Sequence, residues 1–150
     1  MRVWRLARSV YPALDGEGSR LYGGRWNEPG TPVVYTAGSL SLAVLEQLVH
    51  LDPSQLPDDY VAYAVEIPDG LEIERVKISD LPDQWNRRAE VRSLQRMGEQ
   101  WAREQNAAVL SVPSAVIPEE RNYLINPRHA DSDQIDVVHG RPFDFDPRLF

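Results

Sequence analysis

A glycine-rich segment near the N-terminus carries the first group that could do chemistry, the guanidinium of Arg25. The segment reads LYGGRWNEPG over residues 21–30. An arginine side chain presents a rigid fork of donors that suits phosphate or carboxylate oxygens, and glycines such as Gly23 and Gly24 let the backbone approach a ligand closely. The pattern is typical either of a surface turn with an incidental arginine or of a turn built to hold an anion.

Glu46 is the second group of this kind. A helix is predicted over residues 42–51, and at about 100° per residue Leu42, Leu45 and Val49 share one arc, with Glu46 at its edge. An unpaired charge beside a buried stripe is strongly disfavoured. The carboxylate is therefore expected either to reach solvent or pair with an arginine, or to act as a catalytic carboxylate at the mouth of a pocket.

Two aromatic residues accompany these charges. Tyr35 lies in a β-branched run and faces opposite to Val34, so it is expected to pack within a sheet or to stack on a planar ligand. Trp26 follows Arg25 directly. It is expected to pack and anchor the turn, with ligand contact as the alternative.

Strands and helices that must position these residues are indicated along the whole chain. Alternating or β-branched residues predict strands, and apolar residues at helical spacing predict two helices. Residues 11–24 are predicted to form a loop, and Ser39 or Ser41 can cap the first helix. The strand over 71–78 is expected to pair with the preceding strand across the turn PDG. The predicted strands cover 3–9, 33–36, 60–68, 71–78, 106–114, 122–126 and part of 133–150, and the helices cover 42–51 and 88–105.

The order of these elements and the composition limit the class of protein. Strands and helices do not alternate strictly, which favours an α+β fold, and 150 residues fit one domain over 1–150. No apolar run approaches the about 20 residues of a membrane helix, and no signal peptide is indicated. With no cysteine in the chain, a cytoplasmic protein is expected.

Several function classes are disfavoured as well. The net charge of −7 argues against binding to a nucleic-acid backbone. No GxGxxG, Walker or GxSxG motif occurs. The three histidines, His50, His129 and His139, form no HExxH pattern, so no metal site is predicted.

Arg25, Tyr35 and Glu46, taken with VPSAVIPEERNYLINPRH over residues 112–129, resemble the RES domain family, the toxins of RES–Xre toxin–antitoxin modules. The resemblance extends from WRL near the start, through GGRWN, to the closing DPRLF. It implies a fold similar to that of ADP-ribosyltransferases of the diphtheria-toxin type, with a split β-core, flanking helices and a cleft for NAD. The implied activity is cleavage of the nicotinamide–ribose bond by phosphorolysis or hydrolysis.

The resemblance also implies roles for individual residues. Arg25 would contact the NAD diphosphate or the attacking phosphate, Tyr35 would stack against nicotinamide, and Glu46 would stabilise the cationic ribose. Ser114 would be the serine of the family name, and Ser111 fits the motif less well. NAD is thus the expected substrate and inorganic phosphate the expected co-substrate, with no separate cofactor.

Further substrate contacts are expected around these four residues. For the asparagines and the histidine among them, hydrogen bonds in turns and at strand ends are the alternative. Arg20 is a weaker candidate for the same purpose. The expected substrate-binding residues are Arg5, Gly24, Trp26, Asn27, Asn122, Asn126 and His129.

The resemblance implies a partner too, an antitoxin with a Xre-like domain that blocks the cleft within an oligomeric complex. Two other functions stay open at this point. One is transfer of ADP-ribose to a metabolic protein, and the other is a non-catalytic binding module on the same fold.

Overall fold

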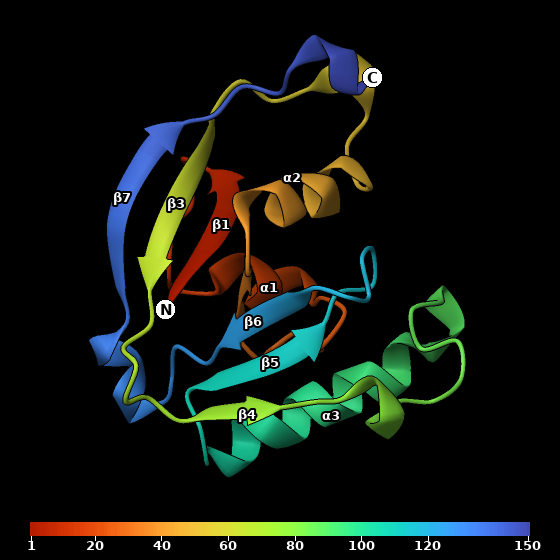
Figure 1. Ribbon diagram of the computed structural model, residues 1–150, viewed down its shortest axis with the longest axis vertical. Coiled ribbons are helices and arrows are strands. Elements are labelled where there is room, and N and C mark those ends of the chain that lie inside the picture. Colours follow the sequence, from red (N-terminus) through yellow and green to blue (C-terminus); the bar gives the residue numbers. More distant parts are fainter.

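A seven-stranded sheet forms the centre of the fold (Figure 1). The structure is a computed structural model that describes residues 1–150. The strand order is β4-β5-β6-β2-β1-β3-β7, and every neighbouring pair is antiparallel except β4 with β5. The strands are β1 (Arg2–Arg8), β2 (Val34–Ala37), β3 (Tyr60–Glu66), β4 (Ile73–Arg75), β5 (Val109–Pro113), β6 (Arg121–Ile125) and β7 (Asp136–Pro142).

The sheet is nearly divided between β1 and β2. β1 pairs with β3 along its whole length, from Arg2 to Arg8, and β2 pairs with β6 along its whole length. In contrast, β1 and β2 share only the pair Trp4 with Ala37. Because so little of the ladder joins them, the half with β1, β3 and β7 turns away from the half with β4, β5 and β6, as Figure 1 shows. The predicted α+β fold is confirmed, and the sheet opens where β1 and β2 part.

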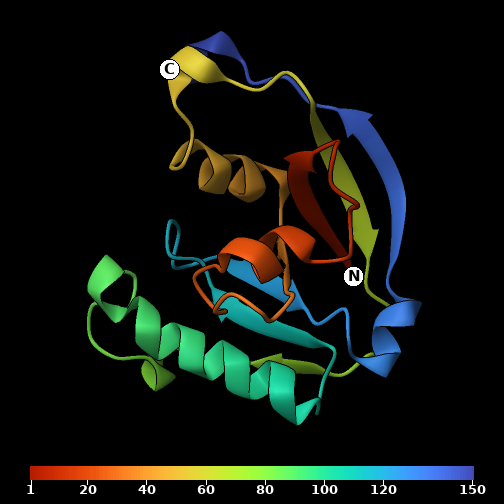
Figure 2. The ribbon, with the colours of Figure 1, turned by 180° about the vertical axis from the view of Figure 1, so that it is seen from behind.

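Three helices cover this sheet: α1 (Glu17–Tyr22), α2 (Leu40–Leu48) and α3 (Val91–Glu104). α2 follows β2 directly, and its Ser39 cap accepts a hydrogen bond from the Leu42 N–H at 3.2 Å, as predicted. α3 lies along β4 and β5, on the side seen in Figure 2. None of the helices is long and apolar enough to cross a membrane.

Each helix helps to bury one part of the core. α3 contributes Leu94 and Trp101 to a cluster that also contains Trp26. α2 contributes Leu42 and Ala43 to a cluster with residues of β1, β2 and β3. A third cluster lies among β1, β2, β3, β5 and β6 and contains Val3, Val34, Val65, Val109 and Ile125. The packing therefore fixes α2 and α3 against opposite halves of the divided sheet.

Two predictions about these elements are wrong. Residues 17–22, expected in a loop, form α1, which is too short to show a helical period and is preceded by Gly16 at φ 67°. β4 does not pair with β3 across the PDG turn but runs parallel to β5, and the Val76 N–H extends this contact to the Ser111 carbonyl at 2.8 Å. An alternating pattern predicts a strand but does not specify its partner.

The predicted buried face of α2 is correct at Leu42 but wrong at Leu45 and Val49. Leu45 and Val49 are 39% and 60% exposed, whereas Leu42 and Ala43 are buried. Apolar residues occur on all sides of this short helix, so helical spacing alone could not select the buried side. The observed face turns Glu46 toward the sheet, instead of leaving it at the edge of a stripe through Leu45 and Val49.

Candidate functional site

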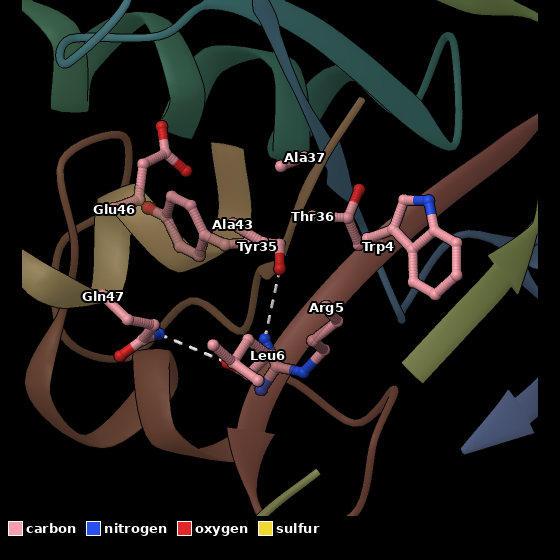
Figure 3. Close-up of a pocket in the computed structure, with 9 residues that line it drawn as sticks. All are labelled: Trp4, Arg5, Leu6, Tyr35, Thr36, Ala37, Ala43, Glu46 and Gln47. Atoms are coloured by element: carbon pink, nitrogen blue, oxygen red, sulfur yellow. Dashed lines mark hydrogen bonds between the residues drawn. The ribbon is translucent and has the colours of Figure 1, made fainter. Parts of the chain in front are cut away.

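A cavity of about 80 Å³ lies beside the opening between β1 and β2, where α2 covers the sheet (Figure 3). A cavity needs a volume of at least about 10–15 Å³ to hold one water. This cavity therefore has room for several waters or one small chemical group but cannot enclose a whole dinucleotide. Its lining residues are Trp4, Arg5, Leu6, Tyr35, Thr36, Ala37, Ala43, Glu46 and Gln47.

Arg25 lies at the tip of a tight turn beside this region. The Gly24 N–H donates to the Asn27 carbonyl at 2.9 Å, and the Asn27 N–H donates back to the Gly24 carbonyl at 3.4 Å. Trp26, also at the tip, is only 2% exposed and packs in the core with Trp101. The tryptophan therefore anchors the turn and is not available to a ligand.

Tyr35 fastens the same turn through its hydroxyl group. The hydroxyl accepts from the Trp26 N–H at 3.1 Å and donates to Asn27 Oδ1 at 2.5 Å. Burial raises the pKa of the Tyr35 phenol, which keeps the proton on this donor. A Cβ at Gly24 would lie 2.6 Å from the Tyr35 hydroxyl oxygen, so the glycine is needed for this contact. The ring of Tyr35 is left to form one wall of the cavity.

Asn27, expected to contact substrate, instead organises the turn from inside. Its side chain is fully buried, and Nδ2 donates to the carbonyls of Ser19 at 3.0 Å and Thr31 at 2.8 Å. Together with Oδ1, which accepts from Tyr35, every polar atom of this amide has a partner. The structure thus gives Asn27 and Gly24 positioning roles in place of the predicted ligand contacts.

Glu46 is only partly exposed to solvent and has no arginine partner within ion-pair distance. The Ser114 hydroxyl donates to Oε1 at 2.8 Å, and Asn122 Nδ2 donates to Oε2 at 2.7 Å. Burial raises the pKa of Glu46, while these two donors and the nearby charge of Arg25 oppose that rise. A donor on each oxygen fixes the carboxylate in one orientation at the cavity wall.

Ser114 and Asn122 are fully engaged in this arrangement. The Ser114 hydroxyl oxygen also accepts from the N–H groups of Val116 at 3.1 Å and Ile117 at 3.2 Å. Asn122 also donates to the Thr36 carbonyl at 3.2 Å. Both residues are therefore brought to the site as predicted, but they position the carboxylate, and their donors are not free for a phosphate.

Arg5 and Arg25 supply the only buried side-chain nitrogen or oxygen atoms that have no hydrogen-bond partner. These atoms are Arg5 Nε and Arg25 Nη1. Arg5 also donates from Nη1 to the Tyr35 carbonyl at 3.2 Å, and burial lowers the pKa of its guanidinium. Because native proteins pair nearly all buried polar atoms, these two free N–H groups mark positions where a ligand can supply an acceptor.

Asn126 and His129, which were expected to contact substrate, are not among the residues that line the cavity. Asn126 Nδ2 donates to the Ala102 carbonyl at 3.2 Å, and His129 Nε2 lies 2.9 Å from the Gln105 carbonyl oxygen. Both side chains fasten the segment after β6 to the C-terminal end of α3. Asn122 lies at one end of β6 and Asn126 just beyond the other, so the motif spans too much of the strand to converge on one site.

Two weaker candidates also serve the scaffold. The hydroxyl oxygen of Ser111 accepts from Arg121 Nε at 3.0 Å, where β4 meets β5. Arg20 forms an ion pair with Glu17 within α1. Neither residue lines the cavity.

Sequence reasoning missed the face of α3 that supports the arginine turn. Gln95 Nε2 donates to the Gly24 carbonyl at 3.0 Å, and Glu99 accepts from the Glu28 N–H at 2.8 Å and from the Thr31 hydroxyl at 2.7 Å. Gly98, between them on the same face, lets the helix touch the backbone of Trp26. The unusual glycine inside a helical pattern was the only sequence signal of this contact.

The raised pKa of Glu46 makes stability depend on pH in a defined direction. The folded chain holds this proton more readily than the unfolded chain above the ordinary value of 4.5, so the free energy of unfolding falls as pH rises toward the raised pKa. Glu46→Gln removes the titrating group. We therefore expect wild type to lose stability relative to the variant in urea unfolding as pH rises above the ordinary value of 4.5. A difference that is constant, or that changes in the opposite direction, would contradict the burial of this carboxylate.

Comparison with known proteins agrees with the architecture and the motifs. Residues 2–146 match the RES domain family. The Prs ADP-ribosylating toxin of Sphingobium sp. (strain YBL2) is 40% identical over 152 residues, which cover 97% of this chain and 94% of that protein. Toxin Res of Photorhabdus laumondii is 39% identical over 152 residues, which cover 99% of this chain and 97% of that protein.

A solved structure shares the fold as well. A chain in the crystal structure of the M. tuberculosis MbcT–MbcA toxin–antitoxin complex superposes with a TM-score of 0.78 at 19% identity, covering 99% of this chain and 85% of that one. The family match spans nearly the whole sequence, and the relatives align over nearly their full lengths. The resemblance drawn from the motifs is confirmed, and this chain belongs to the RES domain family.

Proposed function

We propose that this chain is the toxin of a toxin–antitoxin module and that it cleaves the nicotinamide–ribose bond of NAD, with inorganic phosphate as the acceptor. The observation that carries this proposal is the carboxylate of Glu46, held at the cavity by Ser114 and Asn122 near the free N–H of Arg25. The names of the relatives support it, since one is a Prs ADP-ribosylating toxin and another a Toxin Res.

The chemistry requires a positive charge to move. Nicotinamide in NAD is already a cation, so it can leave as a neutral molecule when the electron pair of the C–N bond returns to the ring. The ribose carbon then carries developing positive charge, and the fixed carboxylate of Glu46 stabilises that charge. Glycosidases use carboxylates against the same kind of transition state. A phosphate oxygen completes the reaction by forming the new C–O bond, which gives ADP-ribose 1''-phosphate.

The remaining parts of NAD have matching groups. Arg25 has a buried N–H without a partner and a fork that suits the oxygens of the diphosphate. Tyr35 offers its ring as a flat wall to nicotinamide. The size of the cavity agrees with this division, because it admits one small ring and leaves the rest of the dinucleotide outside.

The acceptor is tested by following labelled NAD. Purified protein is incubated with NAD labelled in the adenylate half, with phosphate, without phosphate, and with a bacterial lysate. Phosphorolysis predicts label on a small molecule that contains one added phosphate, formed only when phosphate is present. Label on a protein band instead would show that a protein, and not phosphate, accepts the ADP-ribose. The name of the Sphingobium relative favours this alternative.

Ser114→Ala tests whether the Ser114 hydroxyl controls the pKa of the Glu46 carboxylate. Loss of the hydroxyl removes the donor to Glu46 Oε1, so the pKa of Glu46 should rise further above its ordinary value. We expect slower nicotinamide release and an acidic limb of kcat/KM displaced to higher pH. Ser111→Ala is the matched control, because that hydroxyl contacts Arg121 and should not displace the limb. If the acidic limb of kcat/KM stayed at the same pH in Ser114→Ala, Ser114 would not control the carboxylate of Glu46.

We also propose an antitoxin as the physiological partner, one with a Xre-like domain that covers the cleft. The support is the structural neighbour, which comes from a toxin–antitoxin complex. Co-expression with the product of an adjacent gene should suppress NAD consumption in cells. Persistent consumption in a stable co-purified complex would contradict blockage of the cleft.

A further inference from the structure

Arg5 is the one charged group at the cavity that the proposed reaction does not yet use. Its Nε–H is buried and unpartnered, and its side chain lines the cavity together with Glu46. Figure 3 shows Arg5 beside the backbone carbonyl of Tyr35, away from the side of the ring where Glu46 lies. A cation and a carboxylate therefore face one small space from different positions.

Three other polar side chains around the cavity already have partners for their donors. The Thr36 hydroxyl donates to the Tyr123 carbonyl at 2.7 Å, and Gln47 Nε2 donates to the Leu6 carbonyl at 3.2 Å. The Tyr35 hydroxyl is engaged with Asn27. Among the buried side-chain donors that line the cavity, Arg5 Nε is thus the one that a ligand must satisfy.

We propose that Arg5 is a specificity-determining residue for the leaving group: its free Nε–H binds the carboxamide oxygen of nicotinamide, and its charge favours the neutral ring over the pyridinium cation. This inference rests on the proposed function, which places nicotinamide against Tyr35 in the cavity. An arginine does not lose its proton in a protein, so the charge is permanent even though burial lowers the pKa of the group.

The position of the charge gives it a role in bond breaking. Before cleavage the positive charge is on the nicotinamide ring, where Arg5 repels it. After the C–N electron pair has moved to the ring, the charge is on the ribose carbon, where Glu46 attracts it. Both interactions become more favourable along the same electron movement, and only such differential interactions accelerate a chemical step. No oxidant, metal or proton transfer is needed for this step.

Three small probes separate charge from shape. Nicotinamide carries the carboxamide on a neutral ring, 1-methylnicotinamide carries it on a cationic ring, and 3-methylbenzamide is the neutral isostere of the latter. Binding is measured by isothermal titration calorimetry with the intact protein. We expect the wild type to bind the two neutral amides at least about tenfold more tightly than the cation. Arg5→Gln, which has no charge, should reduce that discrimination to less than about threefold.

Arg5→Lys and Arg2→Gln complete the design. Lysine keeps the charge and should retain discrimination against the cation. Arg2 lies on the same strand, outside the cavity, with a side chain 54% exposed, so its replacement removes one positive charge without changing the probes' affinities. Two results would overturn the proposal. One is discrimination against the cation that is equally strong in Arg5→Gln and wild type, and the other is equal affinity of wild type for 1-methylnicotinamide and 3-methylbenzamide.

The kinetics of NAD cleavage supply an independent readout. Because the repulsion acts on bound substrate, Arg5→Gln should lower kcat while KM for NAD stays equal or falls. A merely structural loss would raise KM or reduce the amount of folded protein instead. If the wild type released no nicotinamide at all, the proposed function would fail. If it released nicotinamide and Arg5→Gln did so with unchanged kcat, only the role of Arg5 would fail.

Discussion

Glu46→Gln should fold normally and release nicotinamide about 10²–10³-fold more slowly than the wild type, the loss found when one fixed electrostatic stabiliser is removed from an active site. Glutamine has nearly the shape of glutamate but carries no charge, so it cannot stabilise the positive ribose. The kcat for nicotinamide release is the quantity to measure, with circular dichroism and urea unfolding as evidence of folding. Full activity in a folded Gln variant would contradict the assigned role.

The local hydrogen bonds call for a second variant. Ser114 and Asn122 both donate to the carboxylate, so an amide nitrogen at this position faces at least one donor. Glu46→Asp keeps the charge but withdraws it from the two donors, and it should retain more activity than Gln if charge dominates. Glu104→Gln is the control for loss of a carboxylate, since Glu104 lies exposed at the end of α3 and its carboxylate accepts a hydrogen bond only from Gln100.

Gly98→Ala is expected to have the largest effect outside the cavity. A Cβ on this residue would lie 1.8 Å from the Trp26 carbonyl oxygen and 2.8 Å from its carbon, both backbone atoms of the turn that carries Arg25. Either α3 or the turn must move. Overpacking of this kind costs about 1–3 kcal/mol, and a displacement of about 1 Å at a reacting group can reduce activity by about 10²-fold.

The sign of the stability change makes this result informative. Alanine favours a helix interior over glycine by about 0.8–1.0 kcal/mol, so without the contact the variant would be more stable than the wild type. Gly18→Ala in α1 is the matched control, because a Cβ there meets nothing within 4 Å and should be neutral or stabilising. Urea unfolding and nicotinamide release measure both effects. Stabilisation of Gly98→Ala with full activity would show that α3 does not position the arginine turn.

The motifs could be predicted from the sequence better than the contacts that hold them. The α+β class, both long helices and the Ser39 cap follow from periodicity and capping chemistry, which are local properties. The partner of β4 does not, because it depends on Ser111 and its neighbours in a strand far along the chain. The divided sheet also depends on pairings between distant strands, which alternation does not encode.

Contacts between distant residues of the site could not be predicted from the sequence either. The resemblance that Arg25, Tyr35 and Glu46 carry implied an anion-binding and charge-stabilising site, and the structure brings Tyr35 and Glu46 to one cavity with Arg25 nearby. Ser114 and Asn122 were expected to act at the site, Asn122 by binding substrate. They are instead directed at Glu46, because a partly buried carboxylate on the sheet-facing side of α2 requires partners that the sequence cannot locate.

Arg5 illustrates what only the tertiary structure can add. In the sequence it is a basic residue of an alternating strand and one of seven expected substrate-binding residues, with no more specific role. In the fold it is the lining residue whose buried N–H has no partner, directly at the opening between β1 and β2. Its importance follows from the missing partner and from its position relative to Glu46, neither of which has a local signature.

Cleavage of NAD by this protein is tested by incubating the purified wild type with NAD and phosphate and quantifying NAD and nicotinamide together over time. Nicotinamide should appear in a one-to-one ratio with the NAD that disappears, and the Glu46→Gln protein should release it at least about 10²-fold more slowly. NAD that stays intact with the folded wild-type protein, or nicotinamide release that is the same in the Gln variant, would contradict the claim.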